Sequence, residues 1–198
     1  MSSTSLTSRT RSALGRGLAV GRLGQDVLGV LGFCALTAVL AQVRVPLPGT
    51  PVPMTLQVLA VLLCGMFLRP AAAAAAMVVY VGAGVMLPFL FAPGSSGLTG
   101  ITGGYLLGFI PAATAVSVLR GRPTGMPRTV VAAAVGSVAV LAFGAFWQMA
   151  LFAWTPAQAF AVGIGPFLPK AAVQVGLVTV IVKLVRKEGA PIERESAP

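Results

Sequence analysis

The sequence has very few charged residues and lacks histidine altogether. Charged residues make up 9% of the 198 residues, whereas 57% are hydrophobic and the mean hydropathy is +0.93. These values lie far outside the usual range of soluble domains, so the sequence predicts an integral membrane protein. Without histidine, zinc proteases, haem sites and imidazole bases lose their usual residues.

Acidic residues are missing from the whole apolar part of the chain, between Asp26 and Glu188. Transporters driven by protons or sodium ions commonly rely on a buried carboxylate, and this part of the sequence has none. A Walker-type phosphate loop is missing too, because neither Lys170 nor Lys183 follows the glycine that this motif requires. We therefore expect no enzyme, no metal site and no cofactor, and any ATP has to be hydrolysed by a partner.

Apolar residues occur in six runs that are separated by turn-forming residues. A bilayer core accommodates about 20 apolar residues per spanning helix. The sequence therefore predicts an all-α integral membrane protein, a compact bundle of six transmembrane helices. We expect a disordered basic tail at 1–25, one membrane domain at 26–187 and a second tail at 188–198; a cleavable signal or transit peptide is the alternative for the first tail. The six runs are 27–44, 55–68, 71–91, 102–119, 129–153 and 162–184.

The distribution of positive charge predicts the orientation of this bundle. Lysine and arginine near the ends of spans concentrate on the cytoplasmic side. With six spans and a cytoplasmic N-terminus, 12 of the 14 lysine and arginine residues fall on that side. We therefore expect both termini in the cytoplasm and a multi-pass protein of the cell membrane. A nucleic-acid partner is not expected, since the sequence has no soluble folded face to carry a basic patch.

Two cations depart from this distribution, Arg44 and Lys170, which fall at the outer ends of the first and last runs. Lys170 follows Pro169 directly, so we expect it in the first turn of the last helix, where free N–H groups favour an anion. Gln174 lies four residues further on and hence on the same helix face. Arg44, Lys170 and Gln174 are therefore predicted to bind an anionic substrate from outside. The alternative for both cations is snorkelling to lipid headgroups.

Two further polar clusters open apolar runs and are predicted to bind substrate. Adjacent glycines allow a ligand or another helix to touch the backbone, and an aromatic ring can stack on a flat solute or belong to the interfacial aromatic belt. The polar side chains at the start of the second run either bind a solute or cap the helix. The residues are Thr102, Gly103, Gly104 and Tyr105 in one cluster, and Thr55 and Gln57 in the other.

The first run carries a series of small residues that lets another helix approach closely. This pattern predicts an interface with a partner protein, and packing within the chain itself explains it equally well. The residues predicted for the interface are Gly32, Cys34, Ala35, Ala38 and Ala41.

Two motifs resemble the BioY family, the biotin-specific S components of energy-coupling-factor (ECF) vitamin transporters. They are VPLPGTPVPMTLQ at residues 45–57 and, 45 residues later, TGGYLLGF at 102–109; the resemblance covers about residues 27–185. It implies six membrane helices and capture of biotin from outside under a lid formed by the proline-rich loop. It also implies association with a transmembrane coupling protein, through the first helix, and with a pair of ABC-type ATPases.

The start of the last helix departs from the family pattern. Relatives usually carry Pro-Phe-x-Pro-Gly-Asp-x-x-Lys there, and the Asp and Lys are implicated in holding biotin. Without a gap the Asp falls on Ala171 and the Lys on Gln174; with a deletion of about four residues the Lys becomes Lys170. The carboxylate is missing in both alignments. The alternatives to biotin transport are therefore an S component for another small vitamin or carboxylate, or a membrane scaffold that transports nothing.

Overall fold

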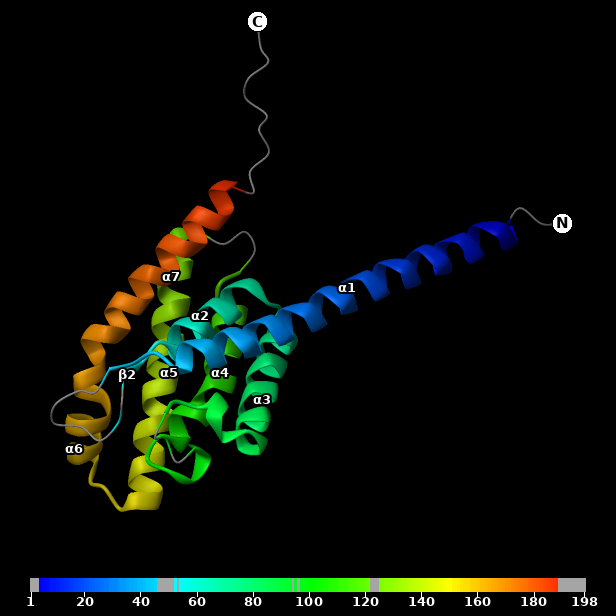
Figure 1. Cartoon of the computed structure of the whole chain (residues 1–198). Helices are drawn as coiled ribbons and strands as arrows, with labels where there is room; N and C mark the ends of the chain where they lie inside the picture. The colour runs from blue at the N-terminus through cyan, green and yellow to red at the C-terminus, as the bar shows by residue number, and fades with distance from the viewer. Residues whose placement is uncertain are drawn as a thin grey trace, which may run out of the picture.

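The computed structural model describes residues 4–45, 52, 54–93, 95, 97–121 and 125–188, and most of this part of the chain is helical (Figure 1). The α-helices are α1 (Thr4–Ala41), α2 (Gln57–Phe67), α3 (Pro70–Met86), α4 (Gly103–Leu119), α5 (Met126–Phe152), α6 (Pro156–Gln158) and α7 (Leu168–Glu188). Shorter elements are the 3-10 turns η1 (Pro88–Leu90), η2 (Gly97–Thr99) and η4 (Gly165–Phe167) and the π-helical turn η3 (Ala159–Ile164).

The predicted all-α membrane class is confirmed, and each of the six apolar runs contains a helix. Three helical stretches in the described part are long and apolar enough to cross a bilayer, and the helices of the other runs are shorter, with 11 or 17 residues. The count of six spans and the cytoplasmic termini therefore stay predictions. The three long stretches are Gly21–Ala41, Met126–Phe152 and Pro156–Lys187.

The N-terminal helix and a small hairpin were not part of the predicted fold. α1 has helical backbone from Thr4, in contrast to the disordered tail expected for residues 1–25; its alanine, leucine and arginine residues are good helix formers. The domain boundary at residue 26 stays a prediction. After α1, β1 (Arg44–Val45) pairs antiparallel with β2 (Met54–Thr55), with Arg44 opposite Thr55. This hairpin brings the two ends of the proline-rich segment together.

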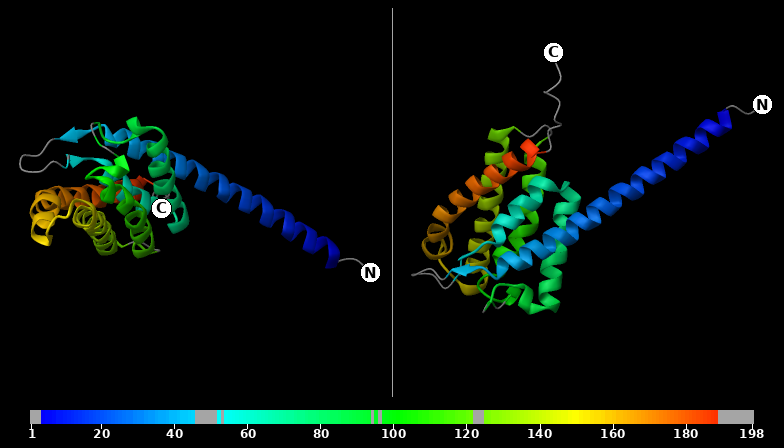
Figure 2. Two further views of the ribbon diagram at one scale, coloured as in Figure 1. Left: turned by 90° about the horizontal axis from the view of Figure 1, so that it is seen from below. Right: turned by 45° about the horizontal axis from the view of Figure 1, so that its top comes forward.

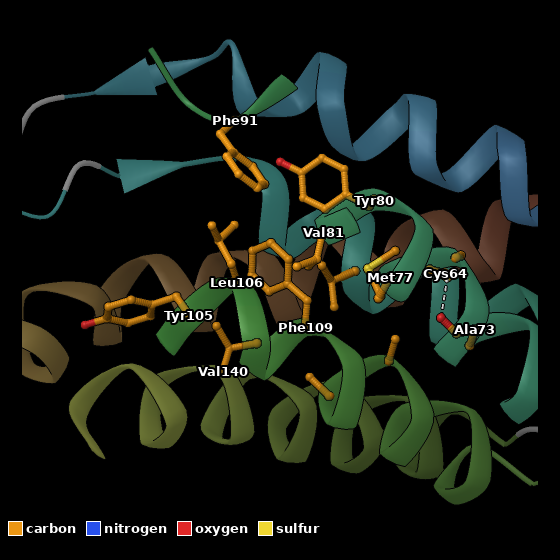
Figure 3. Close-up of a cluster of buried hydrophobic side chains, with 14 of the residues drawn as sticks. Cys64, Ala73, Met77, Tyr80, Val81, Phe91, Tyr105, Leu106, Phe109 and Val140 are labelled. Carbon is orange, nitrogen blue, oxygen red and sulfur yellow. Dashed lines mark hydrogen bonds between the residues drawn. The ribbon is translucent and has the colours of Figure 1, made fainter. Parts of the chain in front are cut away.

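α4 lies at the centre of the bundle and packs against α2, α3 and α5. α7 packs on α5 and α2. The C-terminal part of α1 packs on α3 and α2, and its N-terminal part extends away from the body (Figure 2). Glycine allows the tightest of these contacts: a Cβ on Gly65 of α2 would lie 2.6 Å from the carbonyl oxygen of Ala113 in α4. The core between α3, α4 and α5 contains Tyr80, Phe109 and Val140 (Figure 3).

The two ends of the bundle differ in chemistry. At one end lie the α2–α3 turn, the C-terminal end of α4, the start of α5 and the C-terminal end of α7 (Figure 1). Here Arg69 forms an ion pair with Asp26 of α1, and Arg120 donates hydrogen bonds to the carbonyls of Met66 and Leu68. At the opposite end lie α6 and the segment of η1 and η2. That second end contains the candidate site.

Candidate binding site

A pocket opens between α2, α4, α5 and the start of α7. Its empty space is about 670 Å³ including the open mouth, within the range of small-molecule sites. Six of the nine residues predicted to bind substrate line it: Thr55, Gln57, Thr102, Tyr105, Lys170 and Gln174. Residues that lie more than 100 positions apart in the sequence thus line one pocket, and their role in binding stays a prediction.

The wall formed by α7 carries the only charge among the described lining residues. α7 begins at Leu168, so Lys170 lies in its first turn as predicted, and Gln174 follows on the same face. The Lys170 ammonium lies 5.8 Å from the centre of the Phe167 ring, a favourable position for a cation–π contact. The family lysine aligns with either Lys170 or Gln174, and both residues line the pocket.

Gln174 has an unpaired donor inside this wall. The side chain is 2% exposed, and among the described residues its Nε2 has no hydrogen-bond partner. A buried donor that stays unpaired costs about 1–3 kcal/mol. Gln174 and Lys170 together therefore favour a ligand that brings acceptor oxygens to α7.

The α2 wall is a polar chain rather than a helix cap. Leu56 precedes α2 and has no side-chain capping bond. Instead, the Thr55 hydroxyl donates to Gln57 Oε1 at 2.8 Å, and Gln57 Nε2 donates to the Tyr80 hydroxyl at 2.5 Å. Tyr80 in turn donates to the Leu90 carbonyl at 3.1 Å. The capping alternative for Thr55 and Gln57 is therefore not observed; both residues line the pocket, and solute binding by them stays a prediction.

Tyr105 lines the pocket, and its hydroxyl is held by other parts of the chain. It is 9% exposed, which does not fit a lipid-facing aromatic belt. Its hydroxyl points away from the buried cluster (Figure 3) and donates to the Gly163 carbonyl at 2.6 Å. Gln148 Nε2 of α5 donates to the same hydroxyl at 3.3 Å. The ring lies 6.2 Å from that of Phe167, so these two aromatics form one wall.

Gly103 and Gly104 are not among the lining residues. A Cβ on Gly104 would overlap Cβ of Trp147, and a Cβ on Gly103 would overlap the Leu98 carbonyl and lie 3.0 Å from the Trp147 ring. The glycine pair was expected to allow either a ligand or another helix to touch the backbone. At Gly104 it is another helix, α5.

Arg44 also does not line the pocket. It is exposed in β1, and its guanidinium donates to the Pro93 carbonyl at 2.5 Å. Thr102 does reach the pocket, where its hydroxyl lies 3.3 Å from that of Ser95. The proline-rich lid that the resemblance implies falls mostly on residues 46–51 and 53, outside the described part of the chain.

The small residues of α1 divide between two faces. Ala41 is fully buried, and Cys34 and Ala38 pack against the chain's own core. Gly32 and Ala35 are exposed, and nothing lies within 4 Å of a Cβ built on Gly32. Packing within the chain therefore accounts for three of the five residues predicted for a partner interface.

Several lining residues were missed by the sequence reasoning. Ser137 of α5 is 4% exposed, and its hydroxyl donates to the Ala133 carbonyl at 3.0 Å, which leaves its oxygen able to accept a bond from the pocket. A lone hydroxyl within an apolar run was the available signal. The apolar lining residues were also missed, because an apolar residue that lines a pocket resembles any other buried residue in the sequence. Three of them, Val52, Leu106 and Phe109, lie within the two quoted motifs; the others are Val58, Ala92, Val140, Leu141 and Phe167.

The sequence also matches known proteins. The family model described as "BioY family" matches residues 11–190. A probable biotin transporter BioY from Pyrococcus horikoshii is 32% identical over 161 residues, 79% of this chain and 93% of the relative. A biotin transporter BioY from Thermotoga maritima is 34% identical over 139 residues, 69% of this chain and 80% of the relative.

The fold is also that of a solved structure. The crystal structure of the S-component for biotin from an ECF-type ABC transporter superposes with a TM-score of 0.74. The match covers 84% of this chain and 93% of that one, at 17% sequence identity. With the family model matched over most of the sequence, the chain belongs to the BioY family.

Proposed function

We propose that this chain is the biotin-binding S component of an ECF-type transporter. It captures biotin from outside and moves it inward with a separate ATP-driven module, without covalent chemistry. The pocket carries this proposal, because in a chain of the BioY family it combines one cation, an unpaired buried amide and apolar walls. Biotin matches these features with a carboxylate, a ureido group and an apolar ring system.

The polar groups of the pocket support a particular arrangement of the ligand. Lys170 pairs with the carboxylate, and Gln174 donates to an acceptor oxygen beside it. The ureido N–H groups need acceptors, and the described lining residues offer neutral oxygens, among them the hydroxyls of Thr55 and Ser137. A neutral acceptor forms a weaker bond than a carboxylate. We therefore expect weaker binding than in relatives that keep the aspartate.

Charge placement supports six membrane spans with both termini in the cytoplasm of a plasma-membrane protein. α1, α2, α3, α4, α5 and α7 are the proposed spans. The basic residues Arg69, Arg120 and Arg128 lie at the ends or beginnings of helices at one end of the bundle, and α7 has Arg186 and Lys187 in its last turn. Lys170 lies at the other end, where an outward-facing pocket requires it.

The exposed small residues of α1 support association with a membrane coupling protein and its ATPase pair. Gly32 and Ala35 lie next to Leu28, Leu31 and Val39 on one exposed face, with 73%, 56% and 63% exposure for the three large side chains. Small residues among larger ones allow a second helix to approach closely in lipid. We propose this face as the contact with the coupling protein.

The proposal is tested by comparing biotin with its methyl ester on detergent-purified protein. Wild-type protein should bind labelled biotin saturably and the ester about tenfold less tightly or worse, since the ester has no negative charge. Lys170→Ala should lose most of the preference for the acid, whereas Lys183→Ala, on an exposed part of α7, should keep it. Saturable binding of a different vitamin but not of biotin would favour the alternative substrate class.

A further inference from the structure

Tyr80 is fully buried and is not among the residues that line the pocket, yet its hydroxyl connects the pocket to the outer loop segment. It accepts from Gln57 Nε2 at 2.5 Å and donates to the Leu90 carbonyl at 3.1 Å. Gln57 belongs to the pocket, and Leu90 ends the 3-10 turn η1. One hydroxyl thus joins two segments that are far apart in the sequence.

The chemistry of this chain determines how the Gln57 amide is oriented. A backbone carbonyl only accepts, so the Tyr80 hydroxyl must give its single proton to Leu90. Its oxygen is then left to accept, and Gln57 has to turn its NH2 group toward Tyr80. The Gln57 carbonyl consequently faces the Thr55 hydroxyl, which donates to it at 2.8 Å. The position of Leu90 therefore sets which groups of Gln57 face the ligand.

The loop segment 88–93 is held in place by other side chains as well. Gln42 Nε2 donates to the carbonyls of Phe89 and Phe91 at 3.2 and 3.3 Å. The Phe91 ring packs edge-on against Tyr80 at 5.8 Å (Figure 3), and the next residue, Ala92, lines the pocket. The packing of this segment against α1 and α3 is thus linked to the pocket residue Gln57 through the Tyr80 hydroxyl.

We propose that Tyr80 is a positioning residue. It orients the Gln57 amide for ligand binding only while segment 88–93 is packed against α1 and α3. This inference rests on the proposed function for its ligand. Tyr80 does not line the pocket, so its hydroxyl affects ligand affinity only through the orientation of Gln57.

The test is a double-mutant cycle in labelled-biotin binding. Tyr80→Phe keeps the ring contacts with Phe91 and Phe109 but removes the hydroxyl. It should weaken binding about five- to tenfold in the wild-type background. In the Gln57→Ala background the same change should alter affinity by less than about twofold, because the amide that it orients is gone. An equal loss in both backgrounds would overturn the inference.

A second pair of variants keeps the test independent of how well Tyr80→Phe folds. Gln42→Ala removes two of the hydrogen bonds that hold segment 88–93, without touching Tyr80, and it should weaken binding in the same Gln57-dependent way. Thr114→Val is the control, because its hydroxyl only bonds the Ile110 carbonyl within α4, and it should leave affinity unchanged. A loss with Thr114→Val as large as that with Tyr80→Phe would mean a general structural effect and would contradict the inference.

Ligand-free hydrogen exchange separates this inference from the proposed function. In protein without ligand, Tyr80→Phe and Gln42→Ala should both speed exchange in peptides that cover 88–93, whereas Thr114→Val should not. Unchanged exchange in both variants would overturn the seating role of Tyr80. If wild-type protein binds no biotin while the two variants still exchange faster than wild type, that result would contradict the proposed function and leave the link between Tyr80 and the loop standing.

Discussion

The Tyr105 hydroxyl donates a 2.6 Å hydrogen bond to the carbonyl of Gly163, 58 residues further along the chain. This bond ties the aromatic wall on α4 to η3, the π-helical turn before the segment that leads into α7. Single π-helical turns are rare and are often found at functional sites. Only the short 3-10 turn η4 separates η3 from α7, and Lys170 lies in the first turn of α7. The Tyr105–Gly163 bond therefore contributes to the position of the Lys170 side chain.

Gly163→Ala is expected to destabilise the protein and to weaken ligand binding. A Cβ at this position would overlap Gln148 Oε1 and lie 3.0 Å from the Tyr105 hydroxyl. Overpacking of this kind costs about 1–3 kcal/mol, and the displaced Tyr105 would disturb the pocket wall. The measurement is thermal unfolding in detergent together with biotin affinity.

The matched control for this substitution is Gly176→Ala in α7, where nothing lies within 4 Å of the added Cβ. Alanine is a better helix former than glycine, so this variant should unfold at the same temperature or slightly higher. An equal loss of stability in the two variants would show that the contact with Gln148 and Tyr105 is not the cause.

Arg120→Ala should lower the melting temperature. Arg120 of the α4–α5 turn donates to the carbonyls of Met66 and Leu68, which α2 leaves free at its C-terminal end. Hydrogen bonds from a charged donor contribute about 1.5–3 kcal/mol each when buried, and less here because the site is partly exposed. Lys187→Ala, an exposed cation in the last turn of α7, is the control and should unfold like wild type. Identical melting curves for all three proteins would contradict this role of Arg120.

Cysteine labelling in intact cells tests the orientation of the bundle. In a background without Cys34 and Cys64, a cysteine placed at exposed Ala157 of α6 should react with a membrane-impermeant maleimide. A cysteine at exposed Lys187 should react only after the cells are permeabilised. The reverse pattern would place the pocket on the cytoplasmic side and would contradict uptake from outside.

Local sequence signals predicted the features that depend on neighbouring residues. Pro70 begins α3 because a helix loses no hydrogen bond to proline in its first turn, and Lys170 and Gln174 share a face because they are four residues apart. Individual hydrogen bonds between segments far apart in the chain were missed. Neither the bond from Gln57 to Tyr80 nor that from Tyr105 to Gly163 has a pattern in the sequence, since each joins two separate elements.

The same limit explains the corrections. Gly104 faces α5 rather than the pocket, and Arg44 turns to the Pro93 carbonyl, because the packing of neighbouring elements decides which way a residue faces. Spacing on α1 identified small residues but could not tell which of them the chain itself covers. Ala41 is fully buried, whereas Gly32, nine residues earlier, is exposed.

The most direct test of the whole account is equilibrium binding of labelled biotin to purified protein with the pocket blocked. Ala171 lines the pocket, and its neighbour Ala172 is exposed on the outside of α7. We predict saturable binding at one site per chain in wild-type protein and in Ala172→Trp, and loss of that binding in Ala171→Trp with folding intact. Unchanged binding in Ala171→Trp, or no binding of biotin by folded wild-type protein, would contradict the assignment of this pocket as a biotin site.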